Sequence, residues 1–146
     1  MLIYDTLSGE KKPLPETGGK PLRFFVCGPT VYDYIHIGNA RTYSAFDTIV
    51  RYLRSRKIKV QYLQNITDID DKIIKRALEE KKHIKTIANF YSRAYKQDMK
   101  SLKIISVNKY APATRYIRQI VKQVQILTEK GLAYKIESEG YYFDIS

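Results

Sequence analysis

The chain has 146 residues, 44% of them hydrophobic and 28% charged, and a single cysteine, Cys27. This length corresponds to one domain, and the composition is that of a globular protein rather than a disordered one. The lone cysteine excludes an internal disulfide framework and a self-contained zinc cage of Cys and His. No stretch approaches the ~18 consecutive apolar residues of a membrane span, and the first residues lack the apolar centre of a signal peptide. We therefore expect a cytoplasmic protein with no membrane partner.

Basic residues outnumber acidic ones, 26 to 15, which gives the chain a formal charge of +11. An excess of this size favours an anionic partner, such as a nucleotide or a nucleic acid. Part of it can equally reflect a composition rich in lysine, isoleucine and tyrosine. Charge alone does not separate these two interpretations.

The first part of the chain is predicted to begin a parallel α/β sheet. A short strand over 2–6 is followed by a polar turn over 8–12. Residues 22–27 form an apolar run without clean alternation, which is typical of a strand buried on both faces of a parallel sheet. Apolar residues then recur at helical spacing from 38 to 57, and a second strand is expected over 59–65. Strand, helix and strand in this order start a parallel α/β sheet.

The second part is predicted to be mostly helical. A helix is expected to start with Thr67 as its N-cap and acidic residues in its first turn, and to end near Lys81. Apolar spacing indicates further helices over 83–102 and 113–130, and a hairpin over 133–144. The last of the three helices is expected to bury one stripe of side chains: Ile117, Ile120, Val121, Val124 and Leu127.

The segment from Phe25 to Asn39 reads FVCGPTVYDYIHIGN and carries the most chemistry. It follows the predicted buried strand and opens the first long helix, where open α/β sheets bind ligands. A helix N-terminus presents free N–H groups and a positive potential to phosphates. Gly38 permits a close backbone approach to a flat ligand, and His36 offers an imidazole donor. A histidine at this position is also typical of a helix cap or a surface residue, so this segment alone does not decide the function.

Longer strings in the same order resemble the cysteinyl-tRNA synthetase family. The resemblance begins with VCGPTVYD, continues with HIGNART and includes QNITDIDDKIIKRA. It extends into KYAPATRYI and LTEKGLAY, and so runs from about Ile3 to Asp144. The intervals between the strings match as well as their letters.

This resemblance implies an α/β fold, the N-terminal half of the Rossmann-like catalytic domain of a class I synthetase. Residues 1–146 would form that portion, with 83–146 the start of a helical connective insertion that ends in a hairpin. The second catalytic half, with its KMSKS loop, and the anticodon-binding region are absent from this sequence. We therefore expect these 146 residues to be inactive by themselves.

The resemblance also implies roles for individual residues. His36 and Asn39 would be catalytic and contact the phosphates of ATP, which is used with Mg²⁺. Pro29 and Gly38 would complete the ATP site.

Cys27 would be one of four ligands of a zinc ion that binds the thiolate of the substrate; a buried, merely structural cysteine is the alternative. Gly28, Thr30 and Thr67 would line the amino-acid pocket. The acidic run Asp68–Asp71 could suggest a second metal site, but capping and the helix dipole explain it better.

The family's activity would be ligation of L-cysteine to tRNA-Cys through a cysteinyl-adenylate, as a step of translation. One alternative is the related cysteine ligase of mycothiol synthesis, which joins the same adenylate to an amino sugar. Three local features resemble the synthetase more than the mycothiol ligase. Val31 stands where that ligase tends to have proline, Arg41 and Thr42 follow HIGNA, and Lys72 follows DIDD. The other alternative is a non-catalytic basic module that binds nucleotide or RNA.

Overall fold

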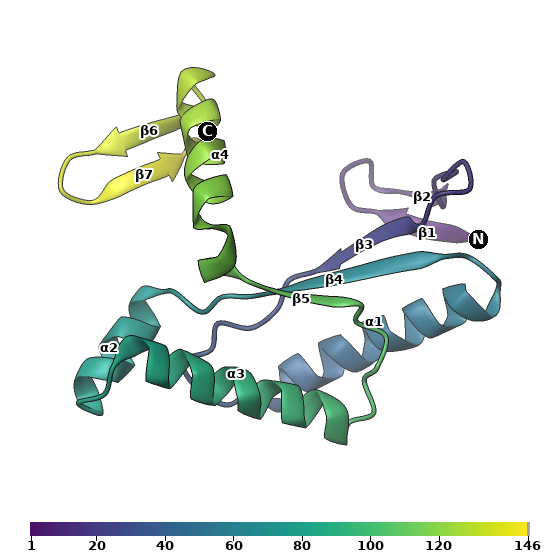
Figure 1. The fold of residues 1–146 in the computed structure, drawn as a ribbon. Coiled ribbons are helices and arrows are strands. Elements are labelled where there is room, and N and C mark those ends of the chain that lie inside the picture. Colours follow the sequence, from purple (N-terminus) through teal and green to yellow (C-terminus); the bar gives the residue numbers. More distant parts are fainter. Residues whose placement is uncertain (146) are drawn as a thin grey trace.

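A three-stranded parallel sheet lies at the centre of the computed structural model, which describes residues 1–145 (Figure 1). Its strands are β3 (Leu22–Val26), β4 (Val60–Ile66) and β5 (Lys109–Pro112), and β4 lies in the middle. The predicted α/β class and parallel strands are confirmed. β5 was not predicted, because it has only four residues and ends in a proline that cannot donate to a ladder.

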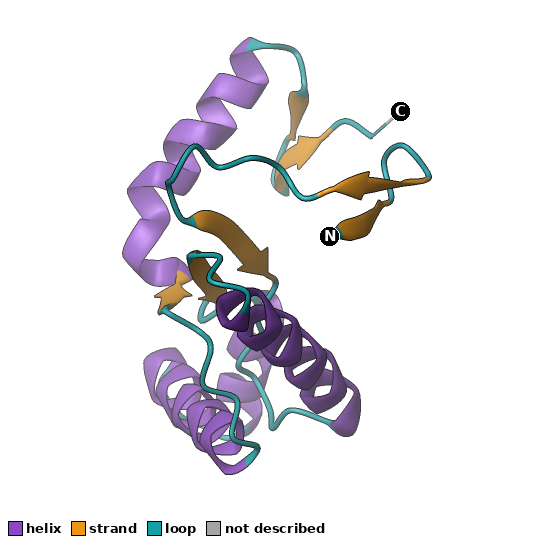
Figure 2. Cartoon of the chain, turned by 90° about the vertical axis from the view of Figure 1, so that its right-hand side faces the viewer, coloured by secondary structure: helices purple, strands orange, loops and turns teal. Residues whose placement is uncertain are grey.

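Three helices cover one face of this sheet: α1 (Ile37–Ser55), α2 (Asp71–Glu79) and α3 (Ile84–Ser101). Figure 2 shows them on one side of the sheet, with α4 and the two hairpins at the N- and C-terminal ends of the chain on the other. Alternate β4 residues, from Val60 to Ile66, are buried on the helix side. In β3, Phe25 is 62% exposed on the opposite side. The prediction that this strand is buried on both faces is therefore wrong.

The core is formed where α1 and α3 meet the sheet. Tyr43 of α1 stacks edge to face against Tyr95 of α3, with ring centroids 5.7 Å apart. Phe24 of β3 makes similar contacts with Phe46 and with Tyr62 of β4. The apolar spacing predicted for these two helices is confirmed in their middle turns, which supply buried side chains that hold them to the sheet. Ile84 and Leu102, at the two ends of the stripe predicted for α3, are instead 39% and 46% exposed.

Two hairpins flank the sheet. β1 (Leu2–Asp5) pairs with β2 (Glu10–Pro13), so the predicted polar turn over 8–12 is partly a strand. At the other end, β6 (Ala133–Ile136) and β7 (Gly140–Phe143) form the predicted hairpin.

The chain leaves the sheet after β5 through a 3₁₀ turn, Ala113–Tyr116, into α4 (Ile117–Glu129). Helix α4 projects from the sheet and packs beside the hairpin (Figure 1). None of its residues is buried, and Val121 is 50% exposed. The predicted buried stripe is wrong, because among residues 1–145 only the hairpin and the preceding turn contact this helix extensively.

Within the expected connective insertion, α3 and β5 pack with the sheet. Where that insertion begins stays a prediction. Along residues 1–145, no helix combines the length and apolarity needed to cross a membrane.

Candidate nucleotide and amino-acid site at the carboxyl edge of the sheet

The carboxyl ends of β3 and β4 bring together three of the predicted site residues. Thr30 and Thr67 form a parallel bridge just beyond the two strands. The Thr67 N–H donates to the Pro29 carbonyl at 3.0 Å, and the Val31 N–H donates to the Thr67 carbonyl at 3.1 Å. Thr67 is therefore not the N-cap of α2. Asp70 has that role, since its carboxylate accepts from the Lys72 N–H at 2.9 Å.

Gly28 is held against the end of β4. Its N–H donates to the Asn65 side-chain oxygen at 2.7 Å, and the Asn65 amide in turn donates to the Thr67 hydroxyl at 3.3 Å. A Cβ at Gly28 would lie 1.8 Å from the Asn65 carbonyl oxygen. Only glycine fits this approach of two backbones. Asn65 was missed as a site residue, although it lies inside one of the strings that carry the family resemblance.

His36 caps helix α1. Its Nδ1 accepts from the Gly38 N–H at 3.0 Å, and its own N–H donates to the Asn39 side-chain oxygen at 3.3 Å. These two bonds form a capping box. Because Nδ1 is an acceptor here, the neutral imidazole carries its proton on Nε2. The interpretation of His36 as a helix cap is thus correct. The cap uses Nδ1 as the acceptor, so Nε2–H is the ring's donor.

Gly38 gives the imidazole its place. A Cβ at this position would lie 2.7 Å from Cε1 and 2.9 Å from Nδ1 of His36. Glycine is therefore needed here for packing inside the protein, because the absence of a Cβ lets the His36 ring lie over the first turn of α1. Whether Gly38 also accommodates adenine stays a prediction.

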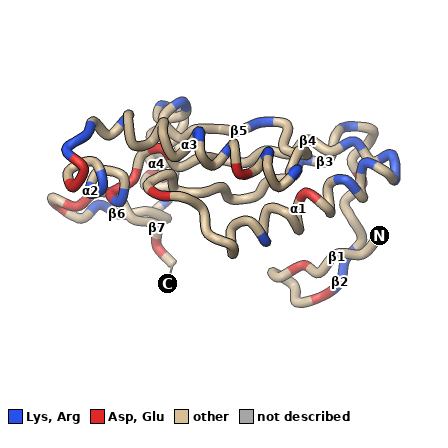
Figure 3. Tube along the Cα trace, turned by 90° about the horizontal axis from the view of Figure 1, so that it is seen from below, with Lys and Arg blue, Asp and Glu red and all other residues tan. Residues whose placement is uncertain are grey.

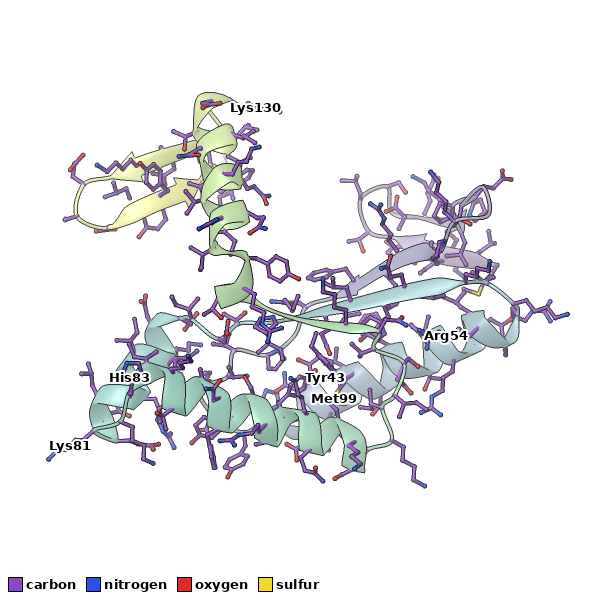
Figure 4. All side chains as sticks on the ribbon, viewed as in Figure 1. Tyr43, Arg54, Lys81, His83, Met99 and Lys130 are labelled. Atoms are coloured by element: carbon purple, nitrogen blue, oxygen red, sulfur yellow. The ribbon has the colours of Figure 1, made fainter. Side chains whose placement is uncertain are left out.

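Tyr43 links α1 to the strand end. Burial is the main cause that raises the pKa of Tyr43 to about 12, with a smaller contribution in the same direction from Cys27. Tyr43 points into the space between α1 and the sheet (Figure 4). The strand end at Val26 and the start of α1 at Ile37 are joined by the short segment that carries the predicted site residues.

Cys27 is exposed, and its Sγ lies 3.7 Å from the Gly28 carbonyl oxygen. It follows the last residue of β3 rather than being part of the strand. The alternative of a small buried structural cysteine is therefore wrong. The thiol is open to a ligand or a metal at the carboxyl edge.

The first turn of α1 itself favours an anion, although the Asp98 carboxylate of α3 lines a hollow beside His36 and Ile37. The first turn of α1 has no acidic residue, and exposed Arg41 follows it closely. The neighbouring Asp33 carboxylate is occupied by Arg76, 3.5 Å away, and by the Tyr34 N–H at 2.8 Å. The helix dipole and the uncapped N–H groups are thus available to phosphates.

Residues 1–145 contain no group of three His, Cys, Asp or Glu side chains placed to hold a metal ion. Cys27 alone does not make a zinc site. In the acidic run, Asp68 accepts from the N–H of Thr114 at 2.9 Å and from its hydroxyl at 2.5 Å, and Asp70 is the helix cap. These contacts give Asp68 and Asp70 structural roles, and Asp71 lies in the first turn of α2.

Residues 14–146 match the family model of the tRNA synthetases class I (C) catalytic domain. The chain belongs to this family. It is 46% identical to the cysteine–tRNA ligase of Thermoplasma acidophilum over 146 residues, which is 100% of this chain and 32% of that protein. The corresponding ligase of Trichormus variabilis is 42% identical over 97% of this chain and 29% of its own length. The resemblance to cysteinyl-tRNA synthetases is confirmed, and the chain spans about a third of these relatives.

Solved structures share the fold. A ternary complex of Agrobacterium radiobacter K84 agnB2 LeuRS with tRNA and LeuAMS superposes with a TM-score of 0.68 at 22% identity, over 82% of this chain and 16% of that one. Mycobacterium tuberculosis methionyl-tRNA synthetase with methionyl-adenylate gives the same TM-score at 18% identity, over 84% and 26%. The Rossmann-like class I fold is confirmed.

Proposed function

We propose that this chain is the N-terminal part of the catalytic domain of a cytoplasmic cysteine–tRNA ligase. The whole protein would join L-cysteine to ATP as an adenylate, releasing pyrophosphate, and then transfer the cysteinyl group to tRNA-Cys. The observation that carries this proposal is the capped His36, with its Nε2 donor, beside Asn39 at the start of α1. Three curated relatives that are cysteine–tRNA ligases, 42–47% identical to this chain, support the choice of amino acid.

In this proposal the helix start binds ATP and its Mg²⁺. The His36 Nε2–H donates to phosphate oxygens and stabilises the negative charge that develops as the α-phosphorus is attacked. Asn39 holds the cap by accepting from the His36 N–H through its side-chain oxygen, and so keeps the imidazole oriented. Pro29 and Gly38 shape the backbone around the nucleotide. Because these donors are already oriented, they need little rearrangement during the reaction.

The amino acid would lie across the strand ends, against Gly28, Thr30 and Thr67. The hydrogen bond from Gly28 to Asn65 and the bridge between Thr30 and Thr67 hold this surface to the strand ends. Cys27 would be one thiolate ligand of a zinc ion, a metal for which sulfur is a preferred ligand. Cys27 belongs to no group of three or more potential ligands among the described residues. The remaining ligands would come from further along the polypeptide.

The role of Cys27 is tested by the metal content of the full-length protein. We expect Cys27→Ser to lower bound zinc several-fold, because a hydroxyl is a poorer zinc ligand than a thiolate. His83→Gln is the matched control, since the His83 side chain caps α3 by accepting from the Lys85 N–H at 3.2 Å. Unchanged zinc in Cys27→Ser would contradict the assignment.

The activity is tested with the full-length protein by ATP–pyrophosphate exchange in the presence of each amino acid. Exchange that depends on cysteine, followed by transfer to tRNA-Cys, is the expected result. Transfer to an amino sugar instead would support the related mycothiol-type ligase. Nucleotide binding without any exchange would show a binding module and contradict the proposal.

A further inference from the structure

A hollow lies at the amino edge of the sheet, where α1 ends and β4 begins. Its volume is about 650 Å³. β4 has seven residues, so this edge is about 20 Å from the site described above at ~3.3 Å per residue. The hollow is lined by three basic residues, Arg54, Lys57 and Lys59, together with Pro21, Gln61 and Asn108 among others, and by no carboxylate.

Arg54 is fixed in place by neutral groups. Its Nη2 donates to the Asn108 side-chain oxygen at 2.7 Å, the Ser106 carbonyl at 3.0 Å and the Val60 carbonyl at 3.4 Å. Asn108 is itself held, because the same oxygen accepts from the Tyr62 N–H at 2.8 Å. The guanidinium is therefore oriented while its charge stays uncompensated. A fixed guanidinium is well suited to oxygen atoms of phosphate.

Lys57 and Lys59 add two exposed cations on the turn between α1 and β4. Lys57 has a positive φ of 62°, so the chain reverses there and places both residues at the rim of the hollow. Within residues 1–145 none of the three basic residues forms an ion pair with a carboxylate. Figure 3 shows Lys and Arg gathered around this turn. Repulsion between these cations is relieved when an anion binds among them.

We propose that this hollow binds phosphate groups, carried either by the backbone of an RNA strand or by a free polyphosphate. Three cations with no carboxylate select for an anion, and the volume exceeds what a single phosphate fills. The proposal is independent of the function assigned to the carboxyl edge, because it uses none of the same residues.

The test compares two double variants of the full-length protein. Lys57→Gln with Lys59→Gln removes two charges at the hollow. Lys81→Gln with Lys130→Gln removes the same charge elsewhere: Lys81 also has a positive φ, 51°, and both lie far from Arg54 (Figure 4). Binding is measured by fluorescence anisotropy with a labelled single-stranded RNA of mixed sequence, and by calorimetry with sodium tripolyphosphate.

We expect the hollow variant to bind RNA at least tenfold more weakly and the control variant within twofold of the parent. The slope of log K against log salt should fall by about one to two, since each lost phosphate contact removes about 0.7 for single strands. Loss of tripolyphosphate binding alone would identify a free phosphate compound as the ligand. Equal effects of the two variants on both ligands would show that only net charge matters and would overturn the proposal.

A second measurement does not depend on the variants. In the parent protein, tripolyphosphate should shift the backbone amide resonances of residues 57–61 and leave that of Lys81 unchanged. No selective shift around the hollow would also contradict the proposal.

Discussion

The two edges of the parallel sheet differ in how they are built. At the carboxyl edge, Gly28 and Gly38 stand where a single added carbon would meet another atom at under 3 Å. At the amino edge, Arg54, Lys57 and Lys59 surround an open hollow. One edge is organised by close fit and hydrogen bonds, the other by charge. The addition of one methyl group should therefore damage the first edge, and the second should respond to charge.

The largest effect is expected for Gly28→Ala. The new Cβ would lie 1.8 Å from the Asn65 carbonyl oxygen, so β3 and β4 must separate at their ends. We expect a loss of more than ~4 kcal/mol in the free energy of unfolding, measured by urea denaturation. Gly131→Ala is the control, since nothing lies within 4 Å and only its φ of 69° opposes alanine. That variant should lose about 1 kcal/mol. Equal losses would contradict the close approach.

Gly38→Ala should lower the rate of adenylate formation while leaving the free energy of unfolding nearly unchanged. Alanine favours a helix over glycine by up to ~1 kcal/mol, which offsets the ~1 kcal/mol lost with the His36 cap, so the net change in stability should be small. The added Cβ, however, would lie 2.7 Å from the His36 ring and must displace it. We expect the rate constant of adenylate formation in the full-length protein to fall about 100-fold. A parent-like rate would mean that the ring position does not matter.

In the middle of α1, Asp47→Asn should lower the free energy of unfolding without changing the rate of adenylate formation. Asp47 is 4% exposed and accepts from the N–H groups of Ile105 and Ser106 at 3.0 and 2.7 Å, and it pairs with Arg51. We expect a loss of ~1–3 kcal/mol at pH 7, with adenylation unchanged within twofold.

The pH dependence of that loss has a definite sign. Burial opposes the charge of Asp47, but the hydrogen bonds from Ser106 and Arg51 prevail and lower its pKa. The stabilisation is therefore complete above the ordinary carboxyl pKa of ~4 and is lost as pH falls below it. Denaturation of the parent and of Asp47→Asn between pH 3 and 7 checks this. A difference that is constant with pH would show that the carboxylate charge is not involved.

The sequence indicated the parts of the fold that depend on local periodicity. The helices that became α1 and α3 follow from their apolar spacing, and the parallel strands from the runs beside them. The N-cap at Thr67 was wrong because the adjacent acidic residues offer several caps, and the choice of Asp70 depends on the bridge that occupies Thr67. The prediction of a buried stripe on α4 was wrong because the spacing of apolar residues shows that one face of a helix is apolar, but does not show which element covers that face.

The candidate site depended more on tertiary contacts. The family strings identified Gly28 and His36, but not why glycine is needed or which imidazole nitrogen is the donor. Asn65 is 37 residues from Gly28 in sequence, and only the sheet brings them within 2.7 Å. The hollow at the amino edge joins Arg54 to Asn108 across 54 residues, which no local pattern predicts.

The central claim, that His36 both caps α1 and donates through Nε2, is tested most directly by His36→Asn in the full-length protein. Asparagine is a good N-cap, so its side-chain oxygen should replace Nδ1 and keep the thermal stability of the parent. It has no donor at the position of Nε2. We therefore predict that the rate constant of adenylate formation, measured before the steady state, falls about 10²–10³-fold. A parent-like rate constant in this stable variant would contradict the account and leave His36 as a helix cap alone.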